Sequence, residues 1–496
     1  MKKIEQKDLF ELKNVGQPVA AGDAFFFTET KMNEKKNTYE TAIYKYTAEG
    51  NVAYGDEGTV NSSLKVSPDG KWISFISNAG EEKTPQLKIQ SVQGGKAVAL
   101  TEEKKGVSGY VWAKDSKSIV FQTTKPEEEE MKEEFPQPIV VEKTTYRFDG
   151  GTFLPNDEVT QIKKVDVATK EVTTLFESKE SIGLRDVLHN ETTLVVDRDL
   201  SNVRWTLDSA EACYVDVTTG DIHPILEAGT DESYRYVLDA KDGAVLQYSS
   251  GKHGFVTQAD LIVNFDSKPD AEGHILNLTA DLDVEWGDWL VADFQQAVTG
   301  VEPQWFDEES FLACASVEGR TVLYRLYLDG RVEKIFDELL HLTGATIISE
   351  DELFITYSTT TVPSVLARLN LKTGEITDLY NPNEAYLAEH IVTTPERFTY
   401  KGYDNWDIHG WYMPPVEKTE KHAAILYVHG GPQVAYGESF FHEMQTLAAK
   451  GYGVIMINPR GSNTYGQDFV KSILGDYGNH DFDDLMMGVD YILETH

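Results

Sequence analysis

Short β-rich runs recur at regular intervals over the first 385 residues, and this repeat restricts the fold more than any other feature. The runs are mostly apolar or β-branched, with turn residues between them. They lie at 24–28, 72–76, 118–122, 194–197, 244–248, 311–315 and 353–357. Neighbours without a long insertion begin about 42 to 50 residues apart, the length of a four-stranded propeller blade. Seven such units predict a seven-bladed β-propeller over residues 1–385.

Polar turns and alternating strands support this repeat. The turn at 67–71 (SPDGK) precedes the second run, and the alternating stretch 162–167 (IKKVDV) leads into a hairpin signal. The long gap after the third run contains the acidic block 126–134. A solvated loop is the ordinary interpretation of such a block, and the alternative is an acidic lip that attracts a peptide amino terminus. The aromatic and Arg residues at 146–151 fit a tunnel lining or blade packing equally well.

The charge balance excludes several kinds of partner. With 45 basic and 82 acidic residues, the net charge of -37 repels nucleic acid and anionic lipid, and the acidity fits solubility. No stretch resembles a membrane-spanning helix, and residues 1–8 lack an apolar signal-peptide core. We therefore expect a cytoplasmic protein. Cys213 and Cys314 lie in apolar strand-like runs and are expected to be buried thiols, so we expect no metal and no cofactor.

The pattern changes from all-β to α/β in residues 386–496. A hairpin is expected within 396–415, followed by short strands at 424–428 and 454–457. A helix is expected at 439–450. Apolar spacing predicts a second helix, marked by Phe482, Leu485, Met486, Val489 and Ile492. This order of elements predicts a parallel sheet wrapped by helices.

Two features of this part carry further expectations. Asp481, Asp483 and Asp484 lie in the first turn of the second helix, where acidic side chains favour the positive end of the helix dipole. The strand at 424–428 runs directly into a glycine turn, His429-Gly430-Gly431-Pro432, abbreviated HGGP. Such a turn exposes backbone N–H groups. In an α/β-hydrolase the loop after the third strand supplies one N–H of the oxyanion hole.

Together these motifs resemble the prolyl oligopeptidase family of serine peptidases, most closely its acylaminoacyl-peptidase-like branch. The matching residues are the blade turn at 67–71, Gly410-Trp411, the HGGP turn, Asn458-Pro459-Arg460-Gly461-Ser462, Tyr465-Gly466, Phe469, Gly475, Gly478, Asp481 and Asp484. The family usually has Trp where this chain has Tyr477. The resemblance implies a seven-bladed propeller plus a partial α/β-hydrolase domain, with the first residues packing on the hydrolase part.

The resemblance also implies roles for residues around the turn. The main-chain N–H of Gly431 is the expected oxyanion donor. His429 is tempting as a catalytic base, but in the family pattern it belongs to the turn. Arg460 is expected to brace the loops near the site through carboxylate contacts. A substrate-loop or structural role is expected for the following residues: His429, Gly430, Pro432, Arg460 and Tyr465.

A nucleophile elbow of the form G-x-S-x-G occurs nowhere in the 496 residues. Residues 106–109 (GVSG) have the wrong spacing, and 461–463 (GSN) follow the preceding strand. The catalytic Ser, Asp and His are therefore absent, and we expect this chain alone to be inactive. The favoured explanation is a fragment of a longer polypeptide, with its last helix and strand edge incompletely covered. The other explanation is a binding module that has lost catalysis.

The expected function of the parent protein is hydrolysis of short peptides by acyl-enzyme chemistry. The propeller is expected to exclude folded proteins. A dipeptidyl-peptidase-like enzyme, an esterase of the same fold and a non-catalytic propeller binding module are the alternatives. Short peptides are the expected partners, and a homo-oligomer and the missing C-terminal part of the hydrolase domain are left open as further ones. The sequence does not choose between acylated and free amino termini of the substrate.

Overall fold

The computed structural model describes most of the chain. The described residues are 1–80, 83–126, 138, 140–142, 146–147, 158–189, 191–204, 206, 209–265, 274–295, 298–417, 419 and 421–496. Nearly all of the acidic block, 127–134, and residues 148–151 of the aromatic segment lie outside them. The interpretations of those two segments therefore stay predictions.

The chain forms two compact units, which are described separately. The first contains Met1–Ala53, Val256–Gln258 and Leu278–His496. The second contains Tyr54–Phe255 and Ala259–Asn277.

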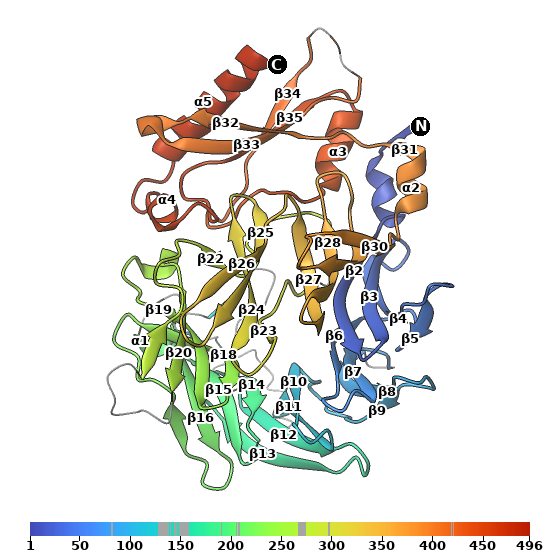
Figure 1. Ribbon diagram of the computed structural model, residues 1–496, viewed down its shortest axis with the longest axis vertical. Helices are drawn as coiled ribbons and strands as arrows, with labels where there is room; N and C mark the ends of the chain where they lie inside the picture. Colours follow the sequence, from blue (N-terminus) through green and yellow to red (C-terminus); the bar gives the residue numbers. More distant parts are fainter. Residues whose placement is uncertain are drawn as a thin grey trace. The chain divides into compact units, whose positions relative to one another are not determined.

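Four antiparallel sheets of four strands make up the second unit (Figure 1). Their strands are β6 (Asn61–Val66), β7 (Trp72–Ser77), β8 (Gln86–Ser91) and β9 (Val98–Ala99); β10 (Gly109–Trp112), β11 (Ser118–Thr124), β12 (Thr160–Asp166) and β13 (Val172–Ser178); β14 (Ile182–Val187), β15 (Thr193–Asp199), β16 (Ala210–Asp216) and β17 (Ile222–Pro224); β18 (Ser233–Ala240), β19 (Gly243–Ser249), β20 (Asp260–Phe265) and β21 (Ile275–Asn277). The short helices are α1 (Ser201–Arg204) and η2 (Gly254–Val256), and the last residue of η2 belongs to the first unit.

Three more antiparallel sheets belong to the first unit, apart from the last residue of β5. Their strands are β2 (Lys13–Ala21), β3 (Ala24–Asn33), β4 (Thr38–Lys45) and β5 (Val52–Tyr54); β22 (Glu285–Trp286), β23 (Gln304–Trp305), β24 (Ser310–Val317), β25 (Arg320–Tyr327) and β26 (Val332–Phe336); β27 (His341–Ser349), β28 (Glu352–Ser358), β29 (Val365–Asn370) and β30 (Ile376–Tyr380). Each of the seven runs found in the sequence lies in the second strand along its sheet, such as β3, β24 or β28.

The second strands are apolar on both faces because each face is buried in a different core. In β28, Leu353 and Ile355 pack with Leu312 of β24, whereas Phe354 packs with Phe25 and its neighbours in β3. The Phe25 and Phe354 ring centroids are 4.9 Å apart. In a strand with one face exposed to solvent, apolar and polar residues alternate. The continuous apolar runs therefore reflect burial of both faces.

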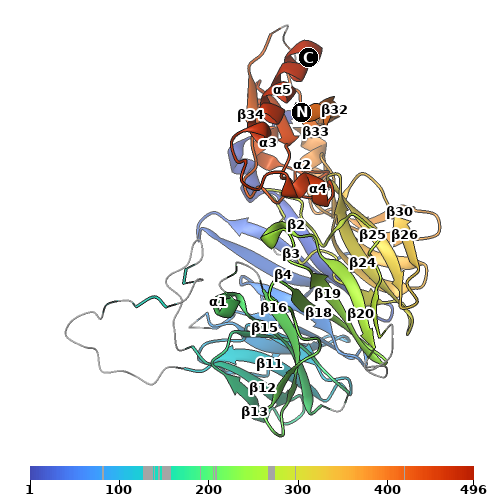
Figure 2. The ribbon, with the colours of Figure 1, turned by 90° about the vertical axis from the view of Figure 1, so that its left-hand side faces the viewer.

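The remaining elements of the first unit form the α/β part (Figures 1 and 2). They are β1 (Lys2–Lys3), η1 (Gln6–Phe10), α2 (Glu384–Glu389), β31 (His390–Ile391), β32 (Glu396–Lys401), η3 (Tyr403–Asn405), β33 (Asp407–Met413), β34 (Ala424–Tyr427), α3 (His442–Ala449), β35 (Gly453–Asn458), α4 (Gln467–Lys471) and α5 (His480–Thr495). The sheet order is β32-β33-β35-β34, with β34 parallel to β35 and the other pairs antiparallel.

Helices α3 and α5 cover opposite faces of this sheet. Val454 and Met456 of β35 pack in one core with Met444 of α3, and Ile455 and Ile457 pack in another core that includes Leu485 and Ile492 of α5. The alternation of β35 thus divides its side chains between two helices. No helix in the described part of the chain is long and apolar enough to cross a membrane.

Helix α3 begins three residues later than the sequence predicts. The carboxylate of Asp293 accepts hydrogen bonds from the N–H groups of His442, at 2.8 Å, and Glu443, at 2.7 Å. These are first-turn donors that a helix cannot satisfy by itself. Residue 441 is the extended N-cap, and Gly451, with φ +96°, follows the carboxyl end.

Helix α5 leaves part of its apolar surface uncovered. Leu485 and Ile492 are buried, but Phe482 is 56% exposed and Leu493 is 72% exposed. Strand β34 pairs only with β35 among the described strands, so its other edge is open. The incomplete covering expected for this helix and strand edge is therefore observed.

The first residues of the chain contact the α/β part. Strand β1 pairs in parallel with β31. Ile4 and Leu12 share a core with Phe440 and with Ala449 of α3. The amino terminus thus helps to cover α3.

Candidate active site

The glycine turn leaves the sheet beside a second loop. Strands β34 and β35 are parallel, so the turn after β34 and the loop after β35 emerge at the same edge. In open α/β sheets, the carboxyl ends of the strands are where ligands bind. The turn, 428–433, and the loop, 459–465, are therefore the first place to look for a site.

The glycine turn presents unpaired backbone donors. Gly430 and Gly431 are exposed, and neither N–H has a partner among the described residues. Gly431 has a φ of +127°, and a Cβ added there would lie 3.2 Å from Cγ2 of Val434. A Cβ on Gly430 would meet nothing within 4 Å. Only Gly431 is required to be glycine by its backbone conformation.

His429 joins the turn to the loop. Its Nε2 lies 3.1 Å from Oγ of Ser462, which in turn donates to the carbonyl oxygen of Pro459 at 2.7 Å. Because the Ser462 proton is used in that bond, His429 Nε2–H is the donor to Ser462. Burial lowers the pKa of His429, which favours this neutral form. Ser462 is completely buried, so the pair does not present a nucleophile.

Arg460 lies at the start of the loop in a buried ion pair. Its Nε is 2.8 Å from Oδ2 of Asp484 and its Nη2 is 3.1 Å from Oδ1, a two-pronged contact. Nη2 also donates to the carbonyl oxygen of Tyr403 at 2.8 Å. Asp484 is fully buried in α5. The sequence suggests a dipole role for Asp484, but the structure places its carboxylate on Arg460.

Asn458, at the end of β35, holds the segment that follows the turn. Its Oδ1 accepts from the N–H of Tyr436 at 2.8 Å, and its Nδ2 donates to the carbonyl oxygen of Tyr436 at 2.9 Å. Nδ2 also donates to the hydroxyl of Tyr465 at 2.9 Å. Burial raises the pKa of Tyr465, so its hydroxyl stays protonated. Tyr465 is therefore linked to the turn through Asn458.

Comparisons with known proteins agree with these motifs. The sequence profile of the prolyl oligopeptidase family, Peptidase_S9, matches residues 438–496. The uncharacterized peptidase YuxL of Bacillus subtilis is 30% identical over 505 residues, which cover 99% of this chain and 76% of YuxL. The chain belongs to the prolyl oligopeptidase family. This is a family of serine peptidases, which are hydrolases.

Solved structures show a similar fold. Acylaminoacyl peptidase of Pyrococcus horikoshii superposes with a TM-score of 0.80 at 23% identity, covering 100% of this chain and 73% of that one. A peptidase of Mycobacterium tuberculosis described as puromycin-hydrolyzing gives a TM-score of 0.64 at 14% identity, covering 97% of this chain and 71% of its own. Dipeptidyl-peptidase 5 of Schizosaccharomyces pombe is 26% identical over 274 residues, 53% of this chain and 36% of that protein.

Residues near the sheet of β22 to β26 hold the segment that follows the HGGP turn. The sequence alone did not predict these contacts. Ala435 donates its N–H to the carbonyl oxygen of Trp289 at 3.1 Å, and Glu438 donates to that of Gly319 at 2.8 Å. A Cβ on Gly437 would lie 2.2 Å from the Gly319 oxygen. No local pattern marks Gly319 or Gly437, because the contact between them joins residues far apart in the sequence.

A second missed cluster has the order of contacts of a catalytic triad. Nδ1 of His341 lies 3.0 Å from Oγ of Ser439, and its Nε2 lies 2.7 Å from Oδ2 of Asp288. His341 is 1% exposed and Ser439 is 3% exposed. A nucleophile must reach a substrate, so this cluster serves as a buried tie between β27 and the segment before α3.

Proposed function

We propose that this chain provides the oxyanion-binding turn of a serine peptidase that hydrolyses short acylaminoacyl peptides. The observation that carries the proposal is the exposed, unpaired N–H of Gly431 at the carboxyl end of β34. The tetrahedral intermediate of peptide hydrolysis bears a negative oxygen that such an N–H stabilises. Loss of one donor of this kind costs about 100- to 1,000-fold in rate.

The other loop residues are proposed to hold the turn in position and not to take part in the reaction. His429, Pro432 and Arg460 shape the turn and its neighbour, and Tyr465 supports them through Asn458. We assign no nucleophile, acid or base to this chain, because its 496 residues contain no G-x-S-x-G. The reaction as proposed needs those groups from polypeptide that adds to the open edge of β34.

The proposed substrate class depends on how much of this chain each similar protein covers. The likeness to acylaminoacyl peptidase covers the whole chain, whereas the match to dipeptidyl-peptidase 5 covers about half. The seven sheets are proposed to close into a ring that admits short peptides only. A dipeptidyl peptidase is the second candidate, because several relatives carry that name.

The test uses the protein in the form in which its host expresses it. Substrates are N-acetylalanyl p-nitroanilide, alanylalanyl p-nitroanilide and p-nitrophenyl acetate. We expect the acetylated substrate to have the highest kcat/KM. A higher kcat/KM for alanylalanyl p-nitroanilide would show that the enzyme is a dipeptidyl peptidase. Activity on p-nitrophenyl acetate alone would show that it is an esterase.

Matched glycine variants test the donor itself. Gly431→Ala keeps the N–H, but alanine is strained at a φ of +127°, so the donor should move away from the oxyanion. We therefore expect kcat to fall about 100-fold with little change in KM, because the oxyanion forms only in the transition state. Gly430→Ala is the control, since a Cβ there meets nothing. Equal kcat values in the two variants would contradict the assignment of Gly431. Labelling of the 496-residue chain alone by a serine-directed fluorophosphonate would contradict the absence of a nucleophile.

A further inference from the structure

Trp289 presents an exposed indole in the segment that pairs with the chain after the HGGP turn. It follows β22 and is 37% exposed, although it is one of the largest side chains. The indole Nε1–H donates to the carbonyl oxygen of Trp286 at 2.9 Å, and the backbone N–H donates to Oγ of Ser316 at 3.0 Å. The indole is therefore held in one orientation, and a ligand that contacts it does not have to immobilise it.

The backbone pairing decides which way Trp289 faces. Leu290 forms a parallel bridge with Ala435, and Ala435 donates its N–H to the carbonyl oxygen of Trp289 at 3.1 Å. Successive side chains of an extended segment point to opposite faces, and paired residues share a face. Cδ1 of Leu290 would lie 3.0 Å from a Cβ added to Gly437, so Leu290 points that way. Trp289 therefore lies on the opposite face, together with Val434, its neighbour across the bridge.

Val434 connects this face to the proposed oxyanion donor. A Cβ added to Gly431 would lie 3.2 Å from Cγ2 of Val434 and 3.6 Å from Cγ1. The N–H of Val434 donates to the carbonyl oxygen of Pro432 at 2.8 Å, which keeps Val434 close to the turn. The face that carries Trp289 and Val434 is thus the face next to Gly431. A peptide whose carbonyl oxygen accepts the Gly431 N–H brings a side chain near this face.

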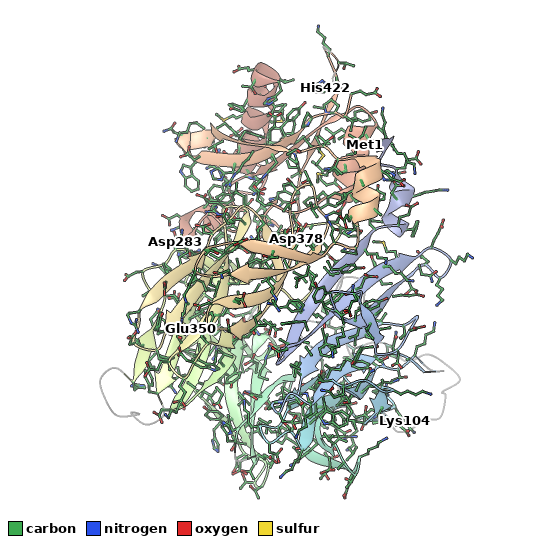
Figure 3. All side chains as sticks on the ribbon, turned by 45° about the vertical axis from the view of Figure 1, so that its right-hand side comes forward. Met1, Lys104, Asp283, Glu350, Asp378 and His422 are labelled. Carbon is green, nitrogen blue, oxygen red and sulfur yellow. The ribbon has the colours of Figure 1, made fainter. Side chains whose placement is uncertain are left out.

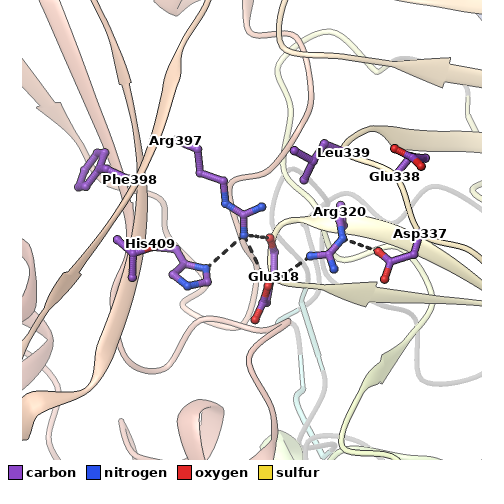
Figure 4. A pocket seen from close by; sticks show the side chains of 9 residues that line it. Glu318, Arg320, Asp337, Glu338, Leu339, Arg397, Phe398 and His409 are labelled. Atoms are coloured by element: carbon purple, nitrogen blue, oxygen red, sulfur yellow. Dashed lines mark hydrogen bonds and ion pairs between the residues drawn. The ribbon is translucent and has the colours of Figure 1, made fainter.

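Charged side chains fix the segment that follows the turn. Arg397 pairs with the Glu318 carboxylate at 3.7 Å, and Arg320 pairs with the same carboxylate at 3.3 Å (Figure 4). Nη2 of Arg397 also donates to the carbonyl oxygen of Glu318 at 3.0 Å. The next residue, Gly319, accepts a hydrogen bond from the N–H of Glu438 at 2.8 Å. These charged groups line an open pocket, but they are paired with one another, and their contacts hold the chain beside Trp289 in place.

We propose that Trp289 determines the specificity of the peptidase by contacting an aromatic or large apolar side chain next to the scissile bond. This role rests on the proposed function, because Gly431 must hold the substrate carbonyl for such a side chain to reach the indole. Aromatic rings attract one another in offset stacks or edge to face, and an indole offers a large surface for this contact. The indole makes and breaks no bond, so it affects the choice of substrate and not the chemical step.

Three acetylated peptides test this role in the protein as its host expresses it. They are N-acetyl-Ala-Ala-Ala, N-acetyl-Phe-Ala-Ala and N-acetyl-Ala-Phe-Ala, each cleaved after the acetylated residue, so the ring is absent, before the bond or after it. We expect wild type to prefer one phenylalanine peptide over the first peptide by about 10-fold in kcat/KM. Trp289→Ala should remove most of that preference, and the peptide affected identifies the side of the bond. No preference in wild type, or an unchanged preference in Trp289→Ala, would overturn the assignment.

Two further variants separate substrate contact from a structural role. Trp289→Phe keeps a ring but lacks the Nε1–H, so it should retain part of the preference. Tyr452→Ala is the matched control, because Tyr452 is 39% exposed and precedes β35, at the other end of that strand from the loop. It should leave the preference unchanged, and thermal unfolding shows whether each variant folds. An equal loss of kcat/KM for all three peptides in Trp289→Ala would mean that Trp289 only supports the fold, and would overturn the assignment.

Peptides with a free amino terminus distinguish failure of this role from failure of the proposed function. Ala-Ala-Ala, Ala-Phe-Ala and Ala-Ala-Phe place the ring at the same two positions for a dipeptidyl peptidase. Hydrolysis of this set alone would contradict the acylaminoacyl substrate class, and Trp289→Ala should then remove the preference for phenylalanine within this set. Hydrolysis of neither set would overturn both the proposed function and the role of Trp289.

Discussion

Two neighbouring loops at one edge of the sheet differ sharply in how they are held. The turn after β34 exposes Gly430 and Gly431 with unpaired N–H groups. The loop after β35 is buried from 459 to 464 and contains the Arg460 to Asp484 ion pair. The difference shows that the buried loop after β35 provides the rigidity, whereas the turn that carries the open donors has few contacts of its own. A site keeps its donors ready for a ligand when the adjacent shell fixes their positions.

The ties between the loops are few and specific. His429 contacts Ser462, and Asn463 donates its N–H to the carbonyl oxygen of Val434 at 3.2 Å. Asn458 holds Tyr436 on both its N–H and its carbonyl group. Substitutions that break the buried contacts of Asp484 and Asn458 should therefore affect stability most, and those in the turn should affect it least.

The largest effect is expected from Asp484→Ala. This change leaves Arg460 buried without its counter-ion, which should cost about 3 to 5 kcal/mol. The urea midpoint for unfolding of the α/β part measures it. Asp407→Asn, which disrupts the exposed pair with Lys401, is the control and should cost under about 1 kcal/mol. Similar midpoints for the two variants would show that the buried pair does not brace the loop.

Asn458→Ala should have the next largest effect, about 3 kcal/mol, because it leaves both backbone groups of Tyr436 without their partner. Hydrogen exchange should also accelerate at Tyr436. Asn479→Ala provides the comparison, since the Asn479 side chain bonds Asp476 at an exposed position. Unchanged exchange at Tyr436 in Asn458→Ala would argue that the turn is held by other contacts.

Gly431→Ala should cost about 1 to 3 kcal/mol, because alanine is strained at a φ of +127°. Gly430→Ala should change the midpoint by less than about 0.5 kcal/mol. Both variants lose the flexibility of glycine, but only Gly431→Ala strains the backbone. The difference between their urea midpoints therefore measures the strain. Equal costs would mean that the turn relaxes and that the position of the Gly431 N–H is not fixed.

The smallest effect concerns pH and His429. Its folded-state pKa is below the usual value near 6.5, so neutral His429 contributes stability above that pH. This contribution is lost as pH falls through the folded-state pKa. Wild type should therefore lose more stability than His429→Gln when the pH is lowered from about 7 to 5. Parallel pH profiles would show that protonation of His429 does not disturb the tie to Ser462.

Local sequence was enough to find the strands and the turn. The seven apolar runs, β34, β35 and the special backbone of Gly431 depend on neighbouring residues, through burial on both faces or a positive φ. The expected α5 face is confirmed for Leu485, Val489 and Ile492, which pack on the sheet, whereas Phe482 and Met486 are exposed. Family membership followed from these motifs together.

Tertiary structure decided the features that join residues far apart in the chain. Asp293 sets the start of α3, and Asp283, labelled in Figure 3, accepts the N–H of Gln467 at 2.7 Å at the start of α4, which the sequence did not predict. Among the three acidic residues near the start of α5, only the fold selects Asp484 for Arg460. A pattern of neighbours cannot encode such pairs, because their partners are chosen by how distant strands and loops come together.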